Sequence, residues 1–399
     1  MKTSRILRQS GLFFLWAGLL VAGPAATASA GQDLDKNALA RKVEPEILKT
    51  MRSAQIPSAT AALVSGEEIV WQGAFGNSNV WGQTPAFPNS VYLIGSTFKT
   101  MSTFALLQLM EQGKFNLDDP VNGRLSEFKI RGEPPGNPVT FRHLLTHTSG
   151  LPADFGPCPV WSYTVPLPLS SYLERSLLLK APPLSGVIYS NIAYTLVAYL
   201  VEKLSGTPYR QYIQEKIFSP LEMADTAFEP RPDMVERLAI PYYYDTKTKN
   251  YVAVGWSKAN VWPAGIVYGT VLNQANWLIA NLNRGVFKGR RLIGEETFQE
   301  VMTRQYDRFA GPLTEGWLNE TTGYGLTWWI SELAGEKLFA HSGSVLGYTA
   351  FLIGNLDRKI GFAVLTNGNR AHRFLFNLGQ NALEILASEL RPIPPGPAR

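Results

Sequence analysis

A serine and a lysine stand three residues apart in GSTFKTMSTFALLQLMEQG, residues 95–113, a segment with the composition of a helix. Helical positions i and i+3 share one face, with Cβ atoms about 5–6 Å apart. A lysine amine beside a serine hydroxyl can take its proton and make the oxygen nucleophilic. The positive end of a helix dipole would also favour an anion there. The pattern predicts Ser96 as an acylating serine with Lys99 beside it; an ordinary N-cap serine is the alternative.

The same spacing occurs a second time in LSEFKIRG, at Ser126 and Lys129, so on its own it is a weak signal. This second copy lies between two proline-containing turns and is followed by no long helical segment. We therefore expect no chemistry from it.

The second candidate is the only Tyr-x-Asn of the chain, Tyr189 and Asn191, just ahead of a strongly apolar helical segment. A tyrosine near a cation can shuttle a proton. An asparagine amide can hold both a lysine ammonium and a substrate carbonyl. The alternative is that Asn191 caps the helix and Tyr189 packs in the core.

The third candidate is His341-Ser342-Gly343 in LFAHSGSVLGYTAFLIGN, where a strand is expected. A glycine within a strand often marks a close approach of another backbone. A cation and a hydroxyl beside it could bind a carboxylate. The alternative is a strand end with a buried, hydrogen-bonded histidine.

The order of these three motifs resembles that of the serine penicillin-recognising enzymes, the class C β-lactamase and DD-peptidase superfamily, which also includes esterases and D-aminopeptidases. The resemblance extends over about residues 45–370. Further segments similar to the family are LDDPV (117–121), HLLTHTSGLP (143–152), SPLEMADTAF (219–228) and GYGLTWW (323–329).

The resemblance implies a role for each matching residue. Ser96 would form an acyl-enzyme, and Lys99 and Tyr189 would share the proton transfers, with the choice of base left open between them. Asn191 would hold the substrate amide and orient Lys99. The backbone N–H groups of Ser96 and Ser344 would form the oxyanion hole.

His341 and Ser342 would lie near the carboxylate end of the substrate, and here the chain departs from the lactamase pattern, which usually has lysine first. Histidine has an unperturbed pKa near 6.5. Carboxylate recognition is therefore expected to be weaker or pH-dependent. Ile266 and Asn273 also replace a glycine and an aspartate of the family pattern, which affects a helix cap and the wall of the site.

The elements that must position these residues follow from the hydrophobic pattern. We expect a helix over 34–54, a hairpin around Ser65-Gly66, helices in the middle of the chain, three strands near the end and a last helix. This predicts an α+β fold, an antiparallel sheet flanked by helices with an inserted all-α subdomain, β-lactamase/transpeptidase-like. The predicted unit is 31–399, with an α/β part at about 31–100 and 315–392 and a mainly helical part at about 101–314.

The N-terminus has the pattern of an export signal. Lys2, Arg5 and Arg8 precede a short apolar run, and Ala28-Ser29-Ala30 resembles a cleavage site. This predicts a signal peptide at 1–30 and a periplasmic or extracellular protein. The apolar run is shorter than the roughly 20 residues that span a bilayer, so no membrane anchor is expected after cleavage.

Composition excludes several classes of function. The net charge of +5 falls to +2 when the three charges of the signal are subtracted, and no basic stripe remains to bind nucleic acid. The four histidines, among them His147 and His341, do not have zinc-ligand spacing, so neither metal nor cofactor is expected. We expect His147 to tie a loop within its own segment, HLLTHTSGLP. Cys158, the only cysteine, can form no internal disulfide.

Three classes of function therefore stay open: an acylating serine hydrolase, a penicillin-binding sensor that does not turn over, and an inactive scaffold. The complete motif set favours the hydrolase. Within it, a β-lactamase/DD-peptidase-like amide hydrolase competes with a carboxylesterase or D-aminopeptidase. The expected substrate is a small-molecule or peptidoglycan-like acyl compound, and loops 154–170 and 315–325 would select it.

Overall fold

The computed structural model describes residues 34–154, 161–162, 167–255, 258–307, 322–369 and 371–390. The chain divides into two units, Met1–Asp33 and Leu34–Arg399, and the fold described here belongs to the second. The predicted signal peptide, Cys158 and most of the two loops predicted to select the substrate lie outside the described residues. Among the described residues, no helix combines the length and apolar character that crossing a bilayer requires.

An eight-stranded antiparallel sheet forms the centre of the unit, in the order β12-β13-β14-β15-β16-β1-β2-β3. The register places Ala62 of β1 opposite Ala363 of β16, so strands from the two ends of the chain are neighbours, and it places Gly343 opposite Ala350 within the C-terminal strands. The strands are β1 (Ser58–Ser65), β2 (Glu68–Asn79), β3 (Thr84–Pro85), β12 (Gly323–Tyr324), β13 (Trp329–Leu333), β14 (Glu336–Val345), β15 (Tyr348–Asn355) and β16 (Ile360–Thr366).

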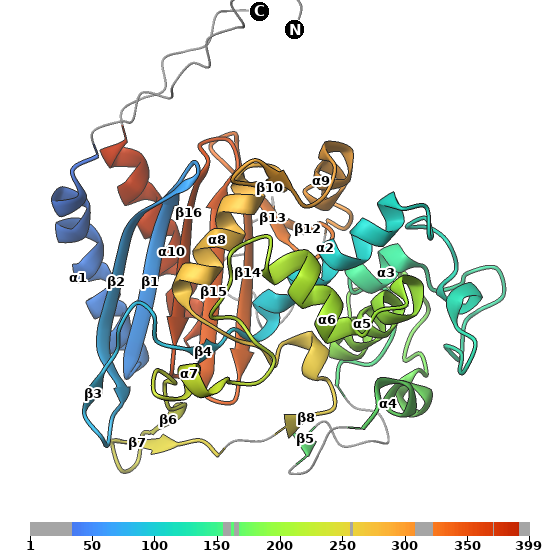
Figure 1. The fold of residues 1–399 in the computed structure, drawn as a ribbon, viewed down its shortest axis with the longest axis horizontal. Coiled ribbons are helices and arrows are strands. Elements are labelled where there is room, and N and C mark those ends of the chain that lie inside the picture. The colour runs from blue at the N-terminus through green and yellow to red at the C-terminus, as the bar shows by residue number, and fades with distance from the viewer. Residues whose placement is uncertain are drawn as a thin grey trace, which may run out of the picture. The chain divides into compact units, whose positions relative to one another are not determined.

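Helices cover both faces of this sheet (Figure 1). The helices α1 (Lys36–Ala54) and α10 (His372–Glu389) pack together on one face, and α8 (Val271–Leu282) packs on the other, against β1 and β16. Asp35 starts α1 by accepting hydrogen bonds from two backbone N–H groups. Buried side chains then recur every four residues, from Leu39 to Met51, which gives α1 its apolar stripe.

The middle of the chain forms a second, largely helical region beside the sheet (Figure 1). Its helices are α2 (Phe98–Glu111), α3 (Phe141–Leu145), α4 (Leu169–Ser176), α5 (Asn191–Ser205), α6 (Tyr209–Ile213), α7 (Pro232–Val235) and α9 (Glu295–Val301). The helix α2 is buried along most of its length, including the polar side chains of Lys99, Thr100 and Ser102, and packs against α5.

The predicted α+β fold is therefore confirmed, with two differences in the middle region. The segment 140–150 was expected to be helical, but α3 has five residues, because Gly150 and a left-handed His147 turn the chain away. Four short strand pairs also interrupt the helices. These pairs are β4 (Tyr92–Leu93) with β9 (Tyr268–Gly269), β5 (Trp161–Ser162) with β8 (Lys258–Ala259), β6 (Tyr242–Asp245) with β7 (Asn250–Ala253), and β10 (Val286–Phe287) with β11 (Arg290–Arg291).

Candidate active site

Ser96 lies in a short 3₁₀ turn, Gly95–Thr97, immediately before α2. The sequence analysis placed Ser96 in the first turn of the helix, whereas in the structure it lies in the tight turn just before the helix begins. From 91 to 107, Ser96 is the one residue that is not fully buried. The backbone therefore presents this hydroxyl, and no neighbouring side chain of the run, at the protein surface.

Three glycines bring three chain segments together around the backbone of Ser96. A Cβ atom on Gly95 would lie 2.9 Å from the amide nitrogen of Ser344, and one on Gly343 would lie 2.9 Å from that of Ser96. A Cβ on Gly265 would lie 2.8 Å from the carbonyl carbon of Gly95. Side chains there would separate the segments. Glycine thus allows the N–H groups of Ser96 and Ser344, the expected oxyanion hole, to lie close together.

Lys99 is fully buried, and its Nζ lies 2.9 Å from Ser96 Oγ and 2.7 Å from the carbonyl oxygen of Ala264. Burial lowers the pKa of Lys99 to about 7, and the charge of Asp154 acts in the opposite direction. The Nζ also lies 5.0 Å from the ring centre of Tyr189. A lysine in this state is partly neutral at neutral pH and can accept a proton from the Ser96 hydroxyl.

The second Ser-x-x-Lys pair has a different environment. Lys129 Nζ bonds to the carbonyl oxygens of Asn122 and Leu125, and Ser126 is exposed. The Lys129 amine therefore stabilises a loop through backbone carbonyl groups and forms no hydrogen bond with the Ser126 hydroxyl among the contacts of the described residues. The expectation that this copy does no chemistry agrees with its contacts.

Tyr189 is the third group at the centre of the site. Its hydroxyl is buried and makes no hydrogen bond of normal geometry among the described residues, although the Ser96 hydroxyl is near enough to affect its pKa. Burial raises the pKa of Tyr189 well above 10, and the Ser96 hydroxyl is the neighbour that opposes this shift. Tyr189 is therefore protonated at working pH, which suits it to donate a proton more than to take one first.

Asn191 is the first residue of α5, but the cap is Ser190, whose hydroxyl accepts from the Ala193 N–H at 3.0 Å. The alternative of a capping Asn191 is therefore wrong. Its side-chain nitrogen donates to Asp154 Oδ1 at 2.5 Å. The contact with Lys99 that the resemblance implied is not among the hydrogen bonds of the described residues: Lys99 Nζ bonds to Ser96 and Ala264, and the Asn191 side chain bonds to Asp154.

Asp154 is a site residue that the sequence reasoning missed. Asp154 accepts a hydrogen bond from Asn191, and its charge raises the pKa values of Lys99 and Tyr189. The available signal was an acidic residue directly after LTHTSGLPA. That signal is weak, because aspartate is common in loops.

His147 was expected to tie a loop within its own segment, residues 143–152, and it holds instead the separate segment that carries Tyr189. Its carbonyl oxygen accepts from Ile188 N–H at 2.9 Å and its Nδ1 accepts from Ser190 N–H at 3.0 Å. Its ring lies 4.2 Å from the Tyr189 ring, centre to centre. His147 therefore fixes the backbone on both sides of Tyr189 and packs on the tyrosine itself.

His341 is buried and stacks in parallel on Trp329, with ring centres 5.2 Å apart. Its Nδ1–H donates to the Ser342 carbonyl at 2.6 Å. Burial lowers the pKa of His341 to about 3, and the Lys99 charge acts in the same direction. The expected pH dependence through this histidine near neutral pH is therefore wrong: His341 is neutral there and provides no cation. Ser342, the next residue of the motif, is also buried.

The other departure from the family pattern lies at the start of α8. Thr270 caps this helix by accepting from the Asn273 N–H at 3.3 Å, and Asn273 Oδ1 accepts from Thr226 at 3.0 Å. Asn273 thus joins two buried segments. The residue that replaces the family's aspartate therefore lies in the first turn of α8, beside its cap.

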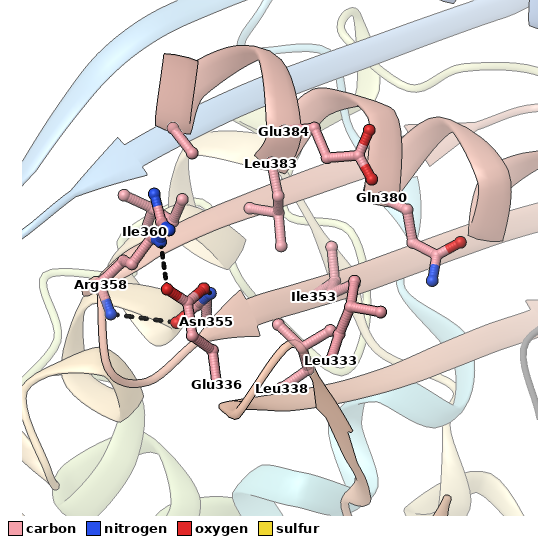
Figure 2. Close-up of a pocket in the computed structure, with 11 residues that line it drawn as sticks. Leu333, Glu336, Leu338, Ile353, Asn355, Arg358, Ile360, Gln380, Leu383 and Glu384 are labelled. Carbon is pink, nitrogen blue, oxygen red and sulfur yellow. Dashed lines mark hydrogen bonds and ion pairs between the residues drawn. The ribbon is translucent and has the colours of Figure 1, made fainter. Parts of the chain in front are cut away.

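A pocket of about 220 Å³ lies elsewhere, between α10 and the ends of β14, β15 and β16 (Figure 2). Leucine and isoleucine side chains form its floor, and an ion pair of Arg358 with Glu336 at 2.6 Å closes one end. No residue of the three motifs lines it. The candidate active site therefore remains the one around Ser96.

Comparison with known proteins agrees with this geometry. Penicillin-binding protein 4* of Bacillus subtilis (strain 168) is 25% identical over 372 residues, 90% of this chain and 78% of that protein. Protein Flp of Staphylococcus aureus (strain MW2) is 24% identical over 337 residues, 82% of this chain, and the match spans 63% of Flp, less than two thirds of its length.

A similar solved structure is that of the octameric penicillin-binding protein homologue from Pyrococcus abyssi, with a TM-score of 0.72 and 28% identity over 87% of this chain and 77% of that one. The family model described as Beta-lactamase matches residues 40–387. That match includes all three motifs and most of the chain, and it confirms the resemblance inferred from them. The chain belongs to the beta-lactamase family.

Proposed function

We propose that this protein is a serine hydrolase that forms an acyl-enzyme on Ser96 and cleaves an amide or an ester. The observation that carries the proposal is the contact between Lys99 Nζ and Ser96 Oγ at 2.9 Å, with the lysine fully buried and its pKa lowered to about 7. A base with a pKa near the working pH is the most effective one.

In the proposed reaction, neutral Lys99 takes the proton of Ser96, whose Oγ attacks the substrate carbonyl. The N–H groups of Ser96 and Ser344 stabilise the oxyanion. The bond to the leaving group then breaks, and the leaving nitrogen or oxygen receives a proton through Tyr189. Water later hydrolyses the ester on Ser96 and restores the hydroxyl. We assign Lys99 as the first base because burial lowers its pKa and raises that of Tyr189.

Within this class, a β-lactamase/DD-peptidase-like amide hydrolase follows from the family. The neutral, stacked His341 supports the second candidate, a carboxylesterase or D-aminopeptidase, because such substrates need no cation at the third motif. A sensor that is acylated and does not turn over would have the same acylating groups.

The experiment is the intact mass of the mature protein over time, first with a fluorophosphonate and then with excess benzylpenicillin, with Ser96→Ala as the control. Labelling by the fluorophosphonate in the parent and not in the variant is expected. Labelling that persists in Ser96→Ala contradicts the assignment of the nucleophile.

The penicillin arm separates the candidates. A stable adduct of one penicillin supports a penicillin-binding peptidase or sensor, and a transient adduct with consumption of the drug supports a lactamase. No adduct, together with fluorophosphonate labelling, supports an esterase or aminopeptidase.

We also propose that the protein is exported to the periplasm or the medium and that residues 1–30 are removed. The basic start, the short apolar run and Ala28-Ser29-Ala30 support this. The mass of the protein recovered outside the cytoplasm tests it: the expected N-terminus is Gly31. A protein retained in the cytoplasm with its N-terminus intact contradicts the proposal.

A further inference from the structure

Two buried residues near Ser96 have an unusual backbone conformation. Among the described residues, twelve that are not glycine have a positive φ, and most of these are exposed. Only His147, with φ 58°, and Thr327, with φ 82°, are fully buried, and Thr327 is the only β-branched residue of the twelve. A branched Cβ makes this conformation costly, and such strain concentrates at functional sites. Both buried residues contact the same side chain, Tyr194.

Thr327 lies in the tight turn between β12 and β13. Its backbone N–H donates to the Gly325 carbonyl at 3.0 Å, and the Gly325 N–H donates to the Trp328 carbonyl at 2.8 Å. Within this turn the Thr327 side chain is directed to α5, and its Oγ1 lies 2.5 Å from the Tyr194 hydroxyl oxygen. The strained backbone of Thr327 therefore brings a hydroxyl to Tyr194.

The direction of the hydrogen bond between the two hydroxyls follows from the other partner of Tyr194. The Tyr194 hydroxyl donates to the Leu145 carbonyl oxygen at 3.2 Å. A carbonyl oxygen only accepts, so this bond uses the single proton of the tyrosine. The contact with Thr327 then requires the threonine hydroxyl as the donor. Thr327 thus completes the hydrogen bonding of a fully buried tyrosine.

Tyr194 in turn contacts Lys99 at both ends of the lysine. The centre of its ring lies 5.6 Å from Lys99 Nζ. Its hydroxyl lies 3.3 Å from Thr103 Oγ1, which donates to the Lys99 carbonyl at 3.1 Å. A lysine side chain is flexible along four carbon atoms, so the neighbouring rings determine where its amine lies. The Tyr194 ring therefore limits movement of the amine away from Ser96.

We propose that Thr327 is a positioning residue for the Lys99–Ser96 pair: its strained backbone fixes a hydroxyl that holds Tyr194, and Tyr194 keeps the Lys99 amine beside Ser96. The inference rests on the proposed function and concerns how the base of that reaction is kept in place. Thr327 and Tyr194 are 133 positions apart, so this one contact joins the edge of the sheet to the helical region behind the base.

A purely structural role for Thr327 is the competing explanation. Three substitutions separate the two. Thr327→Val keeps the shape of the side chain and the strained backbone and removes the hydroxyl, Thr327→Gly removes the hydroxyl and the strain together, and Thr327→Ser keeps the hydroxyl. A structural role predicts that activity follows thermal stability among the three variants. Positioning predicts that activity follows the hydroxyl.

The test measures the second-order rate of fluorophosphonate labelling of Ser96 at pH 7, with kcat and KM for p-nitrophenyl butyrate, a neutral ester. Both the labelling rate and kcat should fall about tenfold or more in Thr327→Val and Thr327→Gly alike, because a displacement of about 1 Å in a reacting group has effects of this size. KM should change little. Thr327→Ser should remain close to the parent, and thermal unfolding of each variant shows that the fold is retained.

A second substitution tests the partner in the contact. Tyr194→Phe keeps the ring and removes the atom that Thr327 holds, so it should slow labelling as Thr327→Val does. In the double variant the two losses should not multiply, because both substitutions remove one interaction. Tyr209→Phe is the matched control: its hydroxyl is also buried and lies 2.7 Å from Ser102 Oγ of α2. This variant should be labelled at the parent rate.

Several outcomes overturn the inference. Labelling at the parent rate in Thr327→Val or in Tyr194→Phe does so, as does a loss in Thr327→Ser equal to that in Thr327→Val. Losses that multiply in the double variant would show that the two hydroxyls act separately. If Thr327→Val does not fold, Thr327→Gly takes its place in each comparison. These outcomes reject the inference alone, whereas absence of labelling in the parent rejects the proposed function with it.

Discussion

Lys99 is the residue on whose surroundings the proposed activity most directly depends. Because burial lowers its pKa to about 7, the lysine is charged below that pH and neutral above it. Only the neutral form accepts the Ser96 proton, so kcat/KM should rise as the pH rises through about 7. A pH profile with a neutral ester, which has no titrating group of its own, measures this. A profile that is flat from pH 5.5 to 8.5 would contradict the role of Lys99 as base.

Asp154 provides a second prediction on the same profile. Its charge raises the pKa of Lys99, so Asp154→Asn should move the acidic limb to lower pH. The same neutral ester serves for the measurement, and Asp233→Asn, which changes an exposed ion pair elsewhere, should leave the limb in place. A limb that moves to higher pH in Asp154→Asn would show that other groups determine the lysine pKa.

His147 acts through Tyr189 and is predicted to be a positioning residue. His147→Ala leaves the Ser190 N–H without its buried acceptor, at a cost of about 1–3 kcal/mol in the free energy of unfolding. Turnover should fall through kcat more than through KM, because Tyr189 loses its support. His147→Asn should restore part of both, since asparagine tolerates the positive φ of 58° and has an acceptor oxygen. Equal effects of the two variants on kcat would contradict this positioning role.

At the scale of single residues, contacts between residues close in the sequence were predictable, and contacts between distant residues were not. Ser96 and Lys99 meet because they are three positions apart at the start of a helix, and this was predictable. Asp154 and Asn191 are 37 positions apart, and only the fold joins them. The neutral state of His341 follows from its burial, which lowers its pKa, and that burial depends on the fold and on no spacing in the sequence.

Among the elements, β14 and the turn before α2 must touch for the site to exist. A Cβ on Gly343 would lie 2.3 Å from the Ile94 carbonyl oxygen and would push the strand off the turn. Gly343→Ala should therefore lower kcat by roughly a hundredfold or more, the effect of losing one oxyanion donor. Gly123→Ala is the control, because a Cβ there meets nothing within 4 Å. Full activity in Gly343→Ala would mean that the Ser344 N–H plays no part.

Long elements with a clear period were predictable from the sequence, and short ones were not. The helices α1, α5, α8 and α10 and the strands β14, β15 and β16 fall where their hydrophobic patterns place them. The two-residue strands of the middle region were missed, because two residues show no period and their pairing depends on contacts distant in sequence.

For the molecule as a whole, we expect α10, on one face of the sheet, to contribute to stability and to have no part in the chemistry at Ser96. Leu386 is fully buried in α10, on the face opposite α8. Leu386→Ala should lower the free energy of unfolding by about 2–5 kcal/mol, the usual cost of emptying a core position. Its kcat/KM without denaturant should remain that of the parent. Urea denaturation and steady-state kinetics measure the two quantities, and a loss of activity in the folded variant would show that α10 supports the site.

The neighbouring placement of β1 and β16 also determines when this protein can fold. Ala62 lies opposite Ala363, so the first strand to leave the ribosome waits for one of the last before its outer edge is paired. Contacts this distant in sequence make folding slow. The strand that carries Ser344 is likewise synthesised long after Ser96, so a nascent chain contains the proposed nucleophile before the second N–H group of the proposed oxyanion hole. A chain that stays unfolded until its synthesis is nearly complete can pass through a membrane channel, as the proposed export requires.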